Sequence, residues 1–377
     1  MFWKWYKEFI LPTGLLAALI IGAGMFALPY IFSKVGLLVG LLYLALFAAV
    51  FSTIHLMYSD VIASTSGKHR FVGYSEIYLG KVGKWVSVIT VLVGLLLTLT
   101  IYLILSASFI GLIAPSLPPT LGVIGFWLMG SAVIIMSLNR LANFEFAVTV
   151  AMIAIIVILF LFGLGQVDFS NLKLLAPGNY NLIQLLLPYG AVLFALSGRA
   201  AISSVRDYFE RNDLDSSRLR LSLVVGTVSS AAVYALFVLA ITWLSPSGVT
   251  IDSVSGIQLV HPWILILIGI LGIFVIWTSY FFLGLEARDI LRYDFKIPLT
   301  SAIILVISLP LILYFYNSQD FIWFINIAGG IFLALESIIV VLMKRKLKPV
   351  GVWGYFIISV FVGGLIYEIF RNFILPT

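Results

Sequence analysis

Long apolar runs make up most of this chain, and the short segments between them hold most of the charged and turn-forming residues. A helix needs about 20 consecutive apolar residues to cross the hydrocarbon core of a bilayer. We predict eleven transmembrane helices, at residues 8–33, 35–64, 83–112, 120–138, 143–164, 181–209, 218–243, 260–287, 297–315, 320–343 and 350–373. Eleven such helices use about 220 residues, which leaves short loops and no room for a sizeable soluble domain.

The composition agrees with this pattern. Of the 377 residues, 62% are hydrophobic and 10% are charged, whereas soluble domains have about 45–50% apolar and about 25% charged residues. The absence of cysteine excludes a disulfide framework, a thiolate metal site and a cysteine nucleophile. We therefore predict an all-α polytopic membrane protein in which residues 1–377 form a single transmembrane domain.

Lysine and arginine residues concentrate on one side of the predicted helices. With the N-terminus in the cytoplasm, Lys34, Lys173 and Arg371 lie outside and Arg199 lies within a span. The other 18 of the 22 cations fall in inner segments, at Lys4, Lys7, Lys68, Arg70, Lys81, Lys84, Arg140, Arg206, Arg211, Arg218, Arg220, Arg288, Arg292, Lys296, Lys344, Arg345, Lys346 and Lys348. Cytoplasmic loops retain such cations. We therefore predict a multi-pass protein of the cytoplasmic (inner) membrane, with a cytoplasmic N-terminus and an extracytoplasmic C-terminus. The net charge of +6 reflects this topology and not nucleic acid binding.

The first predicted helix is interrupted near its middle. It contains GAGMFALPY at residues 22–30, where Gly22 and Gly24 permit non-helical dihedral angles and Pro29 lacks an amide proton. Irregular backbone at this depth is tolerated only where it is buried in protein or lines a cavity. The segment therefore indicates an unwound stretch, with a close-packing surface for a neighbouring helix as the alternative.

The sixth predicted helix carries a second interruption, FALSGRAAISS at residues 194–204. Ser197 and Gly198 follow an apolar half-helix, and Arg199 comes directly after them. A cation inside the membrane is costly, so we expect Arg199 to face a water-filled cavity or a carboxylate. The alternative is that its side chain extends to the cytoplasmic headgroups from a short half-helix.

The two interruptions occupy corresponding positions in two halves of the chain. Spans one to five cover residues 8–164, spans six to ten cover residues 182–343, and each half begins with its interrupted helix. Because five is an odd number, the second half enters the membrane from the opposite side. Paired interruptions in inverted halves indicate the binding site of a secondary transporter. Residues 350–373 form an extra C-terminal helix.

Four stretches carry a resemblance to a known family, namely GAGMFALPYIFSKVG in the first span, YSEIYLGKVGKW at 74–85, LFALSGRAAISSVRDY at 193–208 and TSYFFLGLEARDIL at 278–291. In this order they resemble the amino acid/auxin permease family and the bacterial aromatic amino acid (tryptophan/tyrosine) permeases, within the amino acid–polyamine–cation superfamily. The resemblance implies a leucine-transporter-type five-plus-five inverted repeat and secondary active transport of amino acids, above all neutral or aromatic ones. Arg199 departs from the pattern, since relatives commonly have histidine or another uncharged residue there.

An unwound first helix suits a zwitterionic substrate. The bare amides at the start of its outer half, which includes Met25 and Phe26, bind a carboxylate together with the positive end of the helix dipole. The resemblance implies that the amides of Ala23 and Gly24 take the substrate carboxylate. It places the substrate ammonium among backbone and hydroxyl oxygens, those of Ile20, Phe194, Ala195 and Ser197. It also implies that Tyr102 closes over the substrate, with a hydrogen bond inside a helix interface as the alternative.

A hydroxyl pair in the eighth span is the candidate site for a coupling ion. Thr278, Ser279 and the Val275 carbonyl place three oxygens on one turn. With freed carbonyls of Ala18 and Ile21 they make a five-oxygen site for Na+, as in sodium-coupled members of the superfamily. The alternative is that both hydroxyls bond the preceding turn of their own helix. Bacterial aromatic permeases are proton symporters, so H+ and Na+ both remain open.

Several other ionisable residues lie within or near the predicted spans. Glu336 is a deep acid on the tenth span and is the candidate proton carrier, because intramembrane acids are functional by default. Asp60 and Glu286 lie near cytoplasmic ends, where we expect them to pair with cations such as Arg206. His55 titrates near neutral pH when unperturbed, but we expect it to be a satisfied histidine in a helix interface.

Other classes of protein fit the sequence less well. An amino-acid sensor on the same fold, without coupled flux, is the alternative function. A membrane enzyme is disfavoured because the chain has no DxxD-type acid pair, no GxxxxGK[ST] and no HExxH motif. Interrupted helices in inverted halves favour alternating access over a channel. We expect no cofactor and no metal beyond co-transported H+ or Na+. The expected partners are the amino acid substrate and the lipid bilayer, with neither nucleic acid nor an obligate protein partner.

Overall fold

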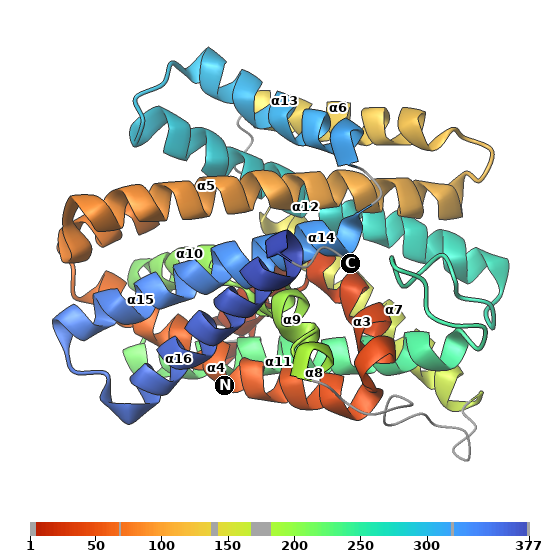
Figure 1. Ribbon diagram of the computed structural model, residues 1–377, viewed down its shortest axis with the longest axis horizontal. Helices are drawn as coiled ribbons and strands as arrows, with labels where there is room; N and C mark the ends of the chain where they lie inside the picture. Colours follow the sequence, from red (N-terminus) through yellow and green to blue (C-terminus); the bar gives the residue numbers. More distant parts are fainter. Residues whose placement is uncertain (1–4, 68, 137–141, 167–181, 318–319, 375–377) are drawn as a thin grey trace.

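The computed structural model describes residues 5–67, 69–136, 142–166, 182–317 and 320–374. All regular elements in these ranges are helices. In these ranges ten helical segments, some made of consecutive elements, are long and apolar enough to cross a membrane, or up to 11 when the bent pair Tyr6–Ile20 and Ala23–Val35 is counted. Most of the long helices run along the long axis of the molecule (Figure 1). The prediction of an all-α, multi-pass membrane protein is therefore confirmed.

The predicted spans correspond to helices or to consecutive sets of helices. In chain order the elements are η1 (Tyr6–Ile10), α2 (Leu11–Ile20), η2 (Ala23–Ala27), α3 (Leu28–Val35), α4 (Leu37–Ala63), α5 (Phe71–Ile113), α6 (Pro119–Met136), α7 (Ala142–Leu164), α8 (Leu182–Leu185), α9 (Pro188–Leu196), α10 (Arg199–Arg211), α11 (Ser216–Leu244), α12 (Pro262–Tyr293), α13 (Leu299–Asn317), α14 (Phe321–Asn326), η4 (Ile327–Leu333), α15 (Ala334–Leu347), α16 (Gly351–Ile369) and η5 (Phe370–Ile374). The helix ends agree with the prediction to within two helical turns, except at the start of α5.

The third span differs most from its prediction, which begins at residue 83. The helix α5 begins at Phe71, and within it Gly80 has a φ angle of 71°, a conformation that glycine adopts at little steric cost. The chain therefore turns at Gly80, and a short helical segment ahead of it leads into the span. This segment contains Glu76, so it falls outside the apolar run even though it is helical.

Both predicted interruptions are present as breaks in helical geometry. In the first span Ile21 has a ψ angle of 90°, Gly22 has φ −140° and ψ −152°, and the two halves are bent by 50°. In the sixth span Ser197 has a ψ angle of 121° and Gly198 has a φ angle of −136°. The extended dihedral angles interrupt the hydrogen-bond ladder of each helix at the positions that the sequence indicated.

The broken helices lie inside the bundle, and intact helices surround them. The half-helix α9 and the 3-10 segment η2 consist entirely of buried residues. They pack against each other, while α9 also packs against α4 and η4. The long helices α5 and α12 pack along each other, and α11 packs against α2, α4 and α7. Large apolar side chains on the outer helices α6, α13 and α16 are exposed, as for lipid-facing positions, for example Leu121, Ile312 and Val352.

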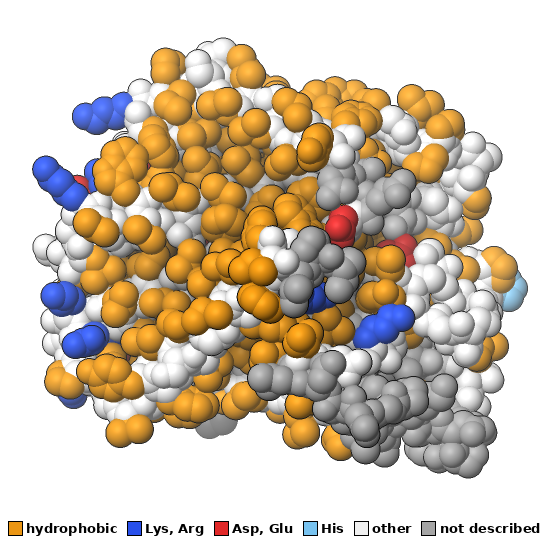
Figure 2. Space-filling view, in the orientation of Figure 1, with side chains coloured by type: hydrophobic (Ala, Val, Ile, Leu, Met, Phe, Trp, Pro, Cys, Tyr) orange, Lys and Arg blue, Asp and Glu red, His pale blue; other side chains and the backbone are white. Residues whose placement is uncertain are grey.

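The surface combines a broad apolar area with a basic edge. Hydrophobic side chains cover most of the face seen in Figure 2, and most of the visible lysines and arginines lie at its left edge. The turn between α15 and α16 is at that edge in Figure 1, and the last turn of α15 contains Lys344, Arg345 and Lys346. Four cations used to predict the orientation lie outside the described residues, namely Lys4, Lys68, Arg140 and Lys173.

Candidate functional site

A cavity of about 830 Å³, including its opening to solvent, lies between the two broken helices. The first broken helix contributes Gly22, Ala23 and Gly24 to its wall, and the sixth contributes Phe194, Ser197 and Gly198. Neighbouring residues of these two helices, together with α5, α12 and the tenth span (η4 and α15), complete the wall. A concave site with a few converging polar groups among apolar walls is the usual form of a small-molecule binding site.

The unwound part of the first helix offers backbone amides. The Met25 amide donates a hydrogen bond to the Gly22 carbonyl at 3.4 Å. Ala23 and Gly24 are the first two residues of η2, so helical geometry gives their amides no acceptor within that helix. Both residues line the cavity. A carboxylate in the cavity therefore has backbone donors and the N-terminal end of η2 within its wall.

Gly24 lies directly against the backbone of the sixth helix. A methyl group added at Gly24 would come within 2.9 Å of the Ala195 amide nitrogen and would also overlap the Ala195 Cα atom. Glycine is the residue that permits this approach of two backbones. The contact holds the two breaks side by side.

Tyr234 joins the two broken helices, and the sequence analysis did not identify it. Its side chain is fully buried on α11. Its hydroxyl lies 2.5 Å from the Ile20 carbonyl oxygen and 2.9 Å from the Ala195 carbonyl oxygen, and it shares its single proton between them. Two of the carbonyls expected to face the substrate ammonium therefore already accept from a protein donor, although each keeps a second lone pair.

Replacing Tyr234 by phenylalanine removes the donor but keeps the ring. We expect the free energy of unfolding to fall by about 1–3 kcal/mol, because buried carbonyls lose their partner. Chemical denaturation of the detergent-purified protein measures this change. Tyr316→Phe is the control, since Tyr316 is 89% exposed and its loss of a hydroxyl should change little. Equal stability of the Tyr234 variant and the wild type would exclude this role.

The hydroxyl groups of Tyr102 on α5 and Ser279 on α12 lie close to Gly22 in the first break. A methyl group added at Gly22 would lie 3.8 Å from the Ser279 hydroxyl oxygen and 3.9 Å from the Tyr102 hydroxyl oxygen. Both side chains line the cavity. On α5, residues that line the cavity recur at intervals of four, at Thr90, Gly94, Thr98 and Tyr102. This spacing places them on one face of the helix, and it would have identified Thr90 and Thr98 from the sequence.

The structure brings together part of the predicted site. The residues in the cavity wall are Ile20, Ala23, Gly24, Tyr102, Phe194, Ser197, Ser279 and Glu336. The other predicted site residues are buried behind the wall, namely Ala18, Ile21, Met25, Phe26, Ala195, Val275 and Thr278. The ring of Phe26 packs edge-on against Phe109 and Phe237, with centroids 4.8 and 5.5 Å away, so its side chain belongs to the packed core.

Two of the proposed ion ligands, Thr278 and Ser279, have contacts that bear on the ion site. The Thr278 hydroxyl donates a hydrogen bond to the Val275 carbonyl at 3.0 Å, which is the bond within the helix that the alternative expects. The Thr278 oxygen keeps its lone pairs in this bond. Ser279 is the member of the pair that lies beside Gly22. The five-oxygen site therefore stays a prediction.

Arg199 faces carboxylates, which is the first of the two outcomes expected for it. Its Nη2 atom lies 3.0 Å from Glu286 Oε1 on α12, and its Nε atom pairs with Glu336 Oε1 on α15. Its guanidinium also lies over the Phe71 ring, 4.6 Å from the centroid. The three charged side chains are largely buried and line the cavity. Sequence reasoning missed the pairing of Glu286 with Arg199.

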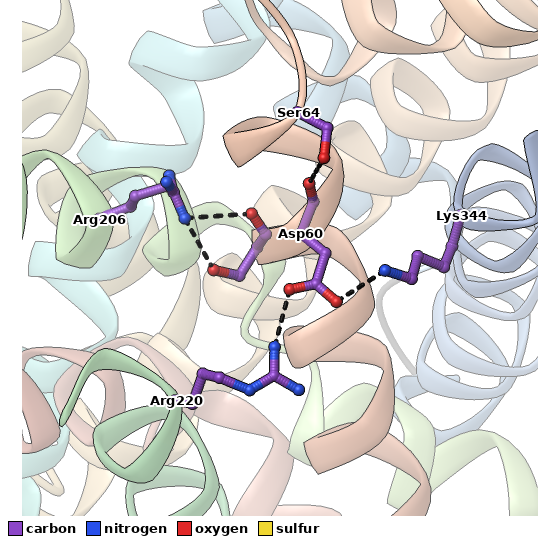
Figure 3. Close-up of polar contacts among 6 residues, drawn as sticks. Asp60, Ser64, Arg206, Arg220 and Lys344 are labelled. Carbon is purple, nitrogen blue, oxygen red and sulfur yellow. Dashed lines mark hydrogen bonds and ion pairs between the residues drawn. The ribbon is translucent and has the colours of Figure 1, made fainter. Parts of the chain in front are cut away.

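A second charged cluster, drawn in Figure 3, surrounds Asp60 near the end of α4 that is predicted to be cytoplasmic. Asp60 on α4 accepts from Arg220 at 2.7 Å and from Lys344 at 2.8 Å. Beside it, Arg206 donates to the carbonyl of Ser59 at 3.2 Å. The expected pairing of Asp60 with Arg206 is replaced by these two cations from α11 and α15. The cluster connects four helices, and its charges are partly exposed.

Comparisons with known proteins agree with this architecture. Among solved structures, the chain is similar to a manganese transporter of Eremococcus coleocola in complex with an aromatic bis-isothiourea substituted compound (TM-score 0.64, 16% identity, 98% of this chain and 87% of that chain). It is also similar to the inward facing conformation of Mhp1 (TM-score 0.62, 13% identity, 95% of this chain and 88% of that chain). At these identities the likeness shows the fold, which is of the leucine-transporter type.

In the part of the chain that the structure describes, no three His, Asp or Glu side chains come together in a way that could hold a metal ion.

No curated protein matches the sequence. The sequence model of the tryptophan/tyrosine permease family matches residues 6–349, nearly the whole chain. The chain therefore belongs to the tryptophan/tyrosine permease family, and it is a membrane transporter and not an enzyme.

Proposed function

We propose that this protein is a secondary active transporter of zwitterionic amino acids, aromatic or other neutral ones, coupled to a gradient of H+ or Na+ by alternating access. The observation that supports this most is the cavity between the two broken helices. It places bare amides of the first helix, the Ser197 hydroxyl of the sixth and a largely apolar wall around one space. The family supports the same class of substrate.

Each end of the substrate has a proposed partner. The amides of Ala23 and Gly24 hold the carboxylate. The ammonium is held by oxygens of Ile20, Phe194, Ala195 and Ser197. Tyr234 already donates to two of these carbonyls. The ammonium therefore either binds the second lone pair of each carbonyl or replaces the tyrosine hydroxyl as the donor. The side chain of the substrate lies among Phe194, Phe282 and Tyr102, where an aromatic ring finds edge and face contacts.

The basic residues support an orientation with the N-terminus in the cytoplasm and the C-terminus outside the cytoplasmic membrane. In that orientation the cavity extends from the two breaks toward the cytoplasm, because its wall includes Thr90, Arg199 and Glu286. The candidate ion sites are the five oxygens of Ala18, Ile21, Val275, Thr278 and Ser279 for Na+, and Glu336 for H+.

Uptake of labelled L-tryptophan and L-tyrosine into proteoliposomes tests the proposal. We expect accumulation above equilibrium when a proton or sodium gradient is imposed, and loss of that accumulation when an ionophore collapses the gradient. Binding without accumulation under any gradient would contradict transport and favour a sensor on the same fold.

Thr278→Ala tests the sodium site. If Na+ is the coupling ion, we expect the Na+ concentration that half-saturates uptake to rise about tenfold, the equivalent of about 1.4 kcal/mol, because one of five ligand oxygens is lost. Uptake measured against ion concentration gives this value. Thr242→Ala is the control, since the Thr242 hydroxyl also bonds its own helix, at 2.7 Å from the Val238 carbonyl, but on α11. Identical ion dependence in the two variants would remove Thr278 from the ion site.

A further inference from the structure

His55 has a defined tautomer because of its neighbour on α11. Its Nδ1 atom lies 2.8 Å from the Thr227 hydroxyl oxygen. That hydroxyl also lies 2.8 Å from the Leu223 carbonyl oxygen, which can only accept. Thr227 has one hydroxyl proton, and both contacts are satisfied only if this proton goes to the carbonyl and Nδ1 of His55 carries its own. The Nε2 atom of the neutral ring is then a bare acceptor.

The Nε2 atom is buried and makes no hydrogen bond to another described residue. The ring lines a small cavity that also has Ser197, Arg199, Glu336 and Ser337 in its wall. Because Nδ1 is occupied by Thr227, Nε2 is the ring nitrogen left for a group in this cavity. This small cavity and the central cavity share the lining residues Ser197, Arg199, Leu333 and Glu336.

The charges around His55 do not balance. Arg199 from α10 carries one positive charge, while Glu336 from α15 and Glu286 from α12 are both paired with it. Glu286 lines the central cavity and is not in the wall of the small cavity that His55 lines. Tyr58, one turn along α4, is a further titratable side chain and is buried, and Arg206 bonds Ser59 on the same helix. With both acids ionised, the group carries a net charge of −1 in a buried place, which is costly unless a cation joins it.

We propose that His55, Arg199, Glu286 and Glu336 form a binding site for one transported proton, held between the Nε2 atom of His55 and the carboxylate of Glu336. The proton arrives as hydronium through the central cavity, forms the Nε2–H bond or the carboxyl O–H bond, and leaves water behind. The loaded site is electrically neutral. This assignment rests on the proposed transport function, commits the coupling ion to H+ and gives Arg199 the role of holding both acids at the cavity wall.

The state of His55 can be observed directly. The chain has three histidines, His55, His69 and His261, so the imidazole ¹⁵N spectrum of the selectively labelled protein is simple, and His55→Asn assigns it. We expect the Nδ1–H tautomer of the neutral ring.

We also expect Glu336→Gln to move the protonation midpoint of His55 to lower pH by about one unit or more, because it removes a nearby negative charge. Glu76→Gln is the control, since Glu76 pairs with Lys84 at the surface. An Nε2–H tautomer, or a midpoint that Glu336→Gln does not move, would overturn the assignment.

Transport gives a second, independent measurement on reconstituted protein. L-tryptophan accumulation driven by a pH gradient is compared with tryptophan exchange at equal pH on both sides. We expect His55→Gln to lower the ratio of accumulation to exchange at least about tenfold, and an unchanged ratio would overturn the assignment. If the wild type neither exchanges nor accumulates tryptophan, the proposed substrate is wrong, and the ¹⁵N titration still decides whether the proton site exists.

Discussion

Gly24→Val is expected to weaken tryptophan binding by about 100-fold or more. The valine Cβ would enter the space held by the Ala195 backbone, whose amide nitrogen would be only 2.9 Å away. The two breaks would have to move apart, and a displacement of about 1 Å in a binding site can cost a factor of about 100. The new branched side chain would also stand beside the amides that are proposed to hold the carboxylate. Binding of labelled L-tryptophan to the purified protein measures the effect.

The chain offers a matched control for this substitution. Gly125 on α6 has no atom within 4 Å of an added Cβ, so Gly125→Val inserts the same side chain into an open position. We expect this control to bind like the wild type. Gly24→Ala, with a smaller side chain, keeps the test informative if the valine variant fails to fold. Native affinity in both Gly24 variants would mean that the two backbones do not form the site.

Arg199→Met is expected to lower the free energy of unfolding by about 3–5 kcal/mol. Removing one partner from a buried ion-pair network leaves the other charges buried without compensation. Here two carboxylates, Glu286 and Glu336, would lose their shared cation. Thermal and chemical unfolding of the detergent-solubilised protein measure the loss.

Neutralising the whole group should restore most of that stability. In Arg199→Met combined with Glu286→Gln and Glu336→Gln no buried charge remains, and replacing all members of a buried network is often close to neutral. We therefore expect the triple variant to be more stable than the single one. If the single variant is as stable as the wild type, Arg199 is not the cation that compensates these acids.

Hydropathy was sufficient to locate the helices, because each span has to bury its own backbone hydrogen bonds in lipid. It also located the breaks, since Gly22 and the Ser197–Gly198 pair are poor continuations of a helix. The start of α5 was different. Its first segment is helical but polar enough to lie outside the apolar run, and the turn at Gly80 depends on a positive φ angle that hydropathy does not report.

The candidate site was predictable where a local signal existed and not where it depended on contacts between distant helices. Gly24 and Ser197 stand out in their own segments. The partners of Tyr234 lie 214 and 39 residues away along the chain, and those of Arg199 lie 87 and 137 residues away. Which face of α11 or α12 turns inward is set by packing, and a span that is apolar on all sides carries no pattern that would reveal it.

The central claim is that backbone groups lining the cavity at two broken helices bind both charged ends of an amino acid. Binding of three related compounds to the purified protein measures this directly: L-tryptophan, tryptamine, which lacks the carboxylate, and indole-3-propionate, which lacks the ammonium. We expect tryptophan to bind at least about tenfold more tightly than either analogue, since each loses one charged contact of about 1.4 kcal/mol or more. Equal affinity for all three compounds would contradict the claim.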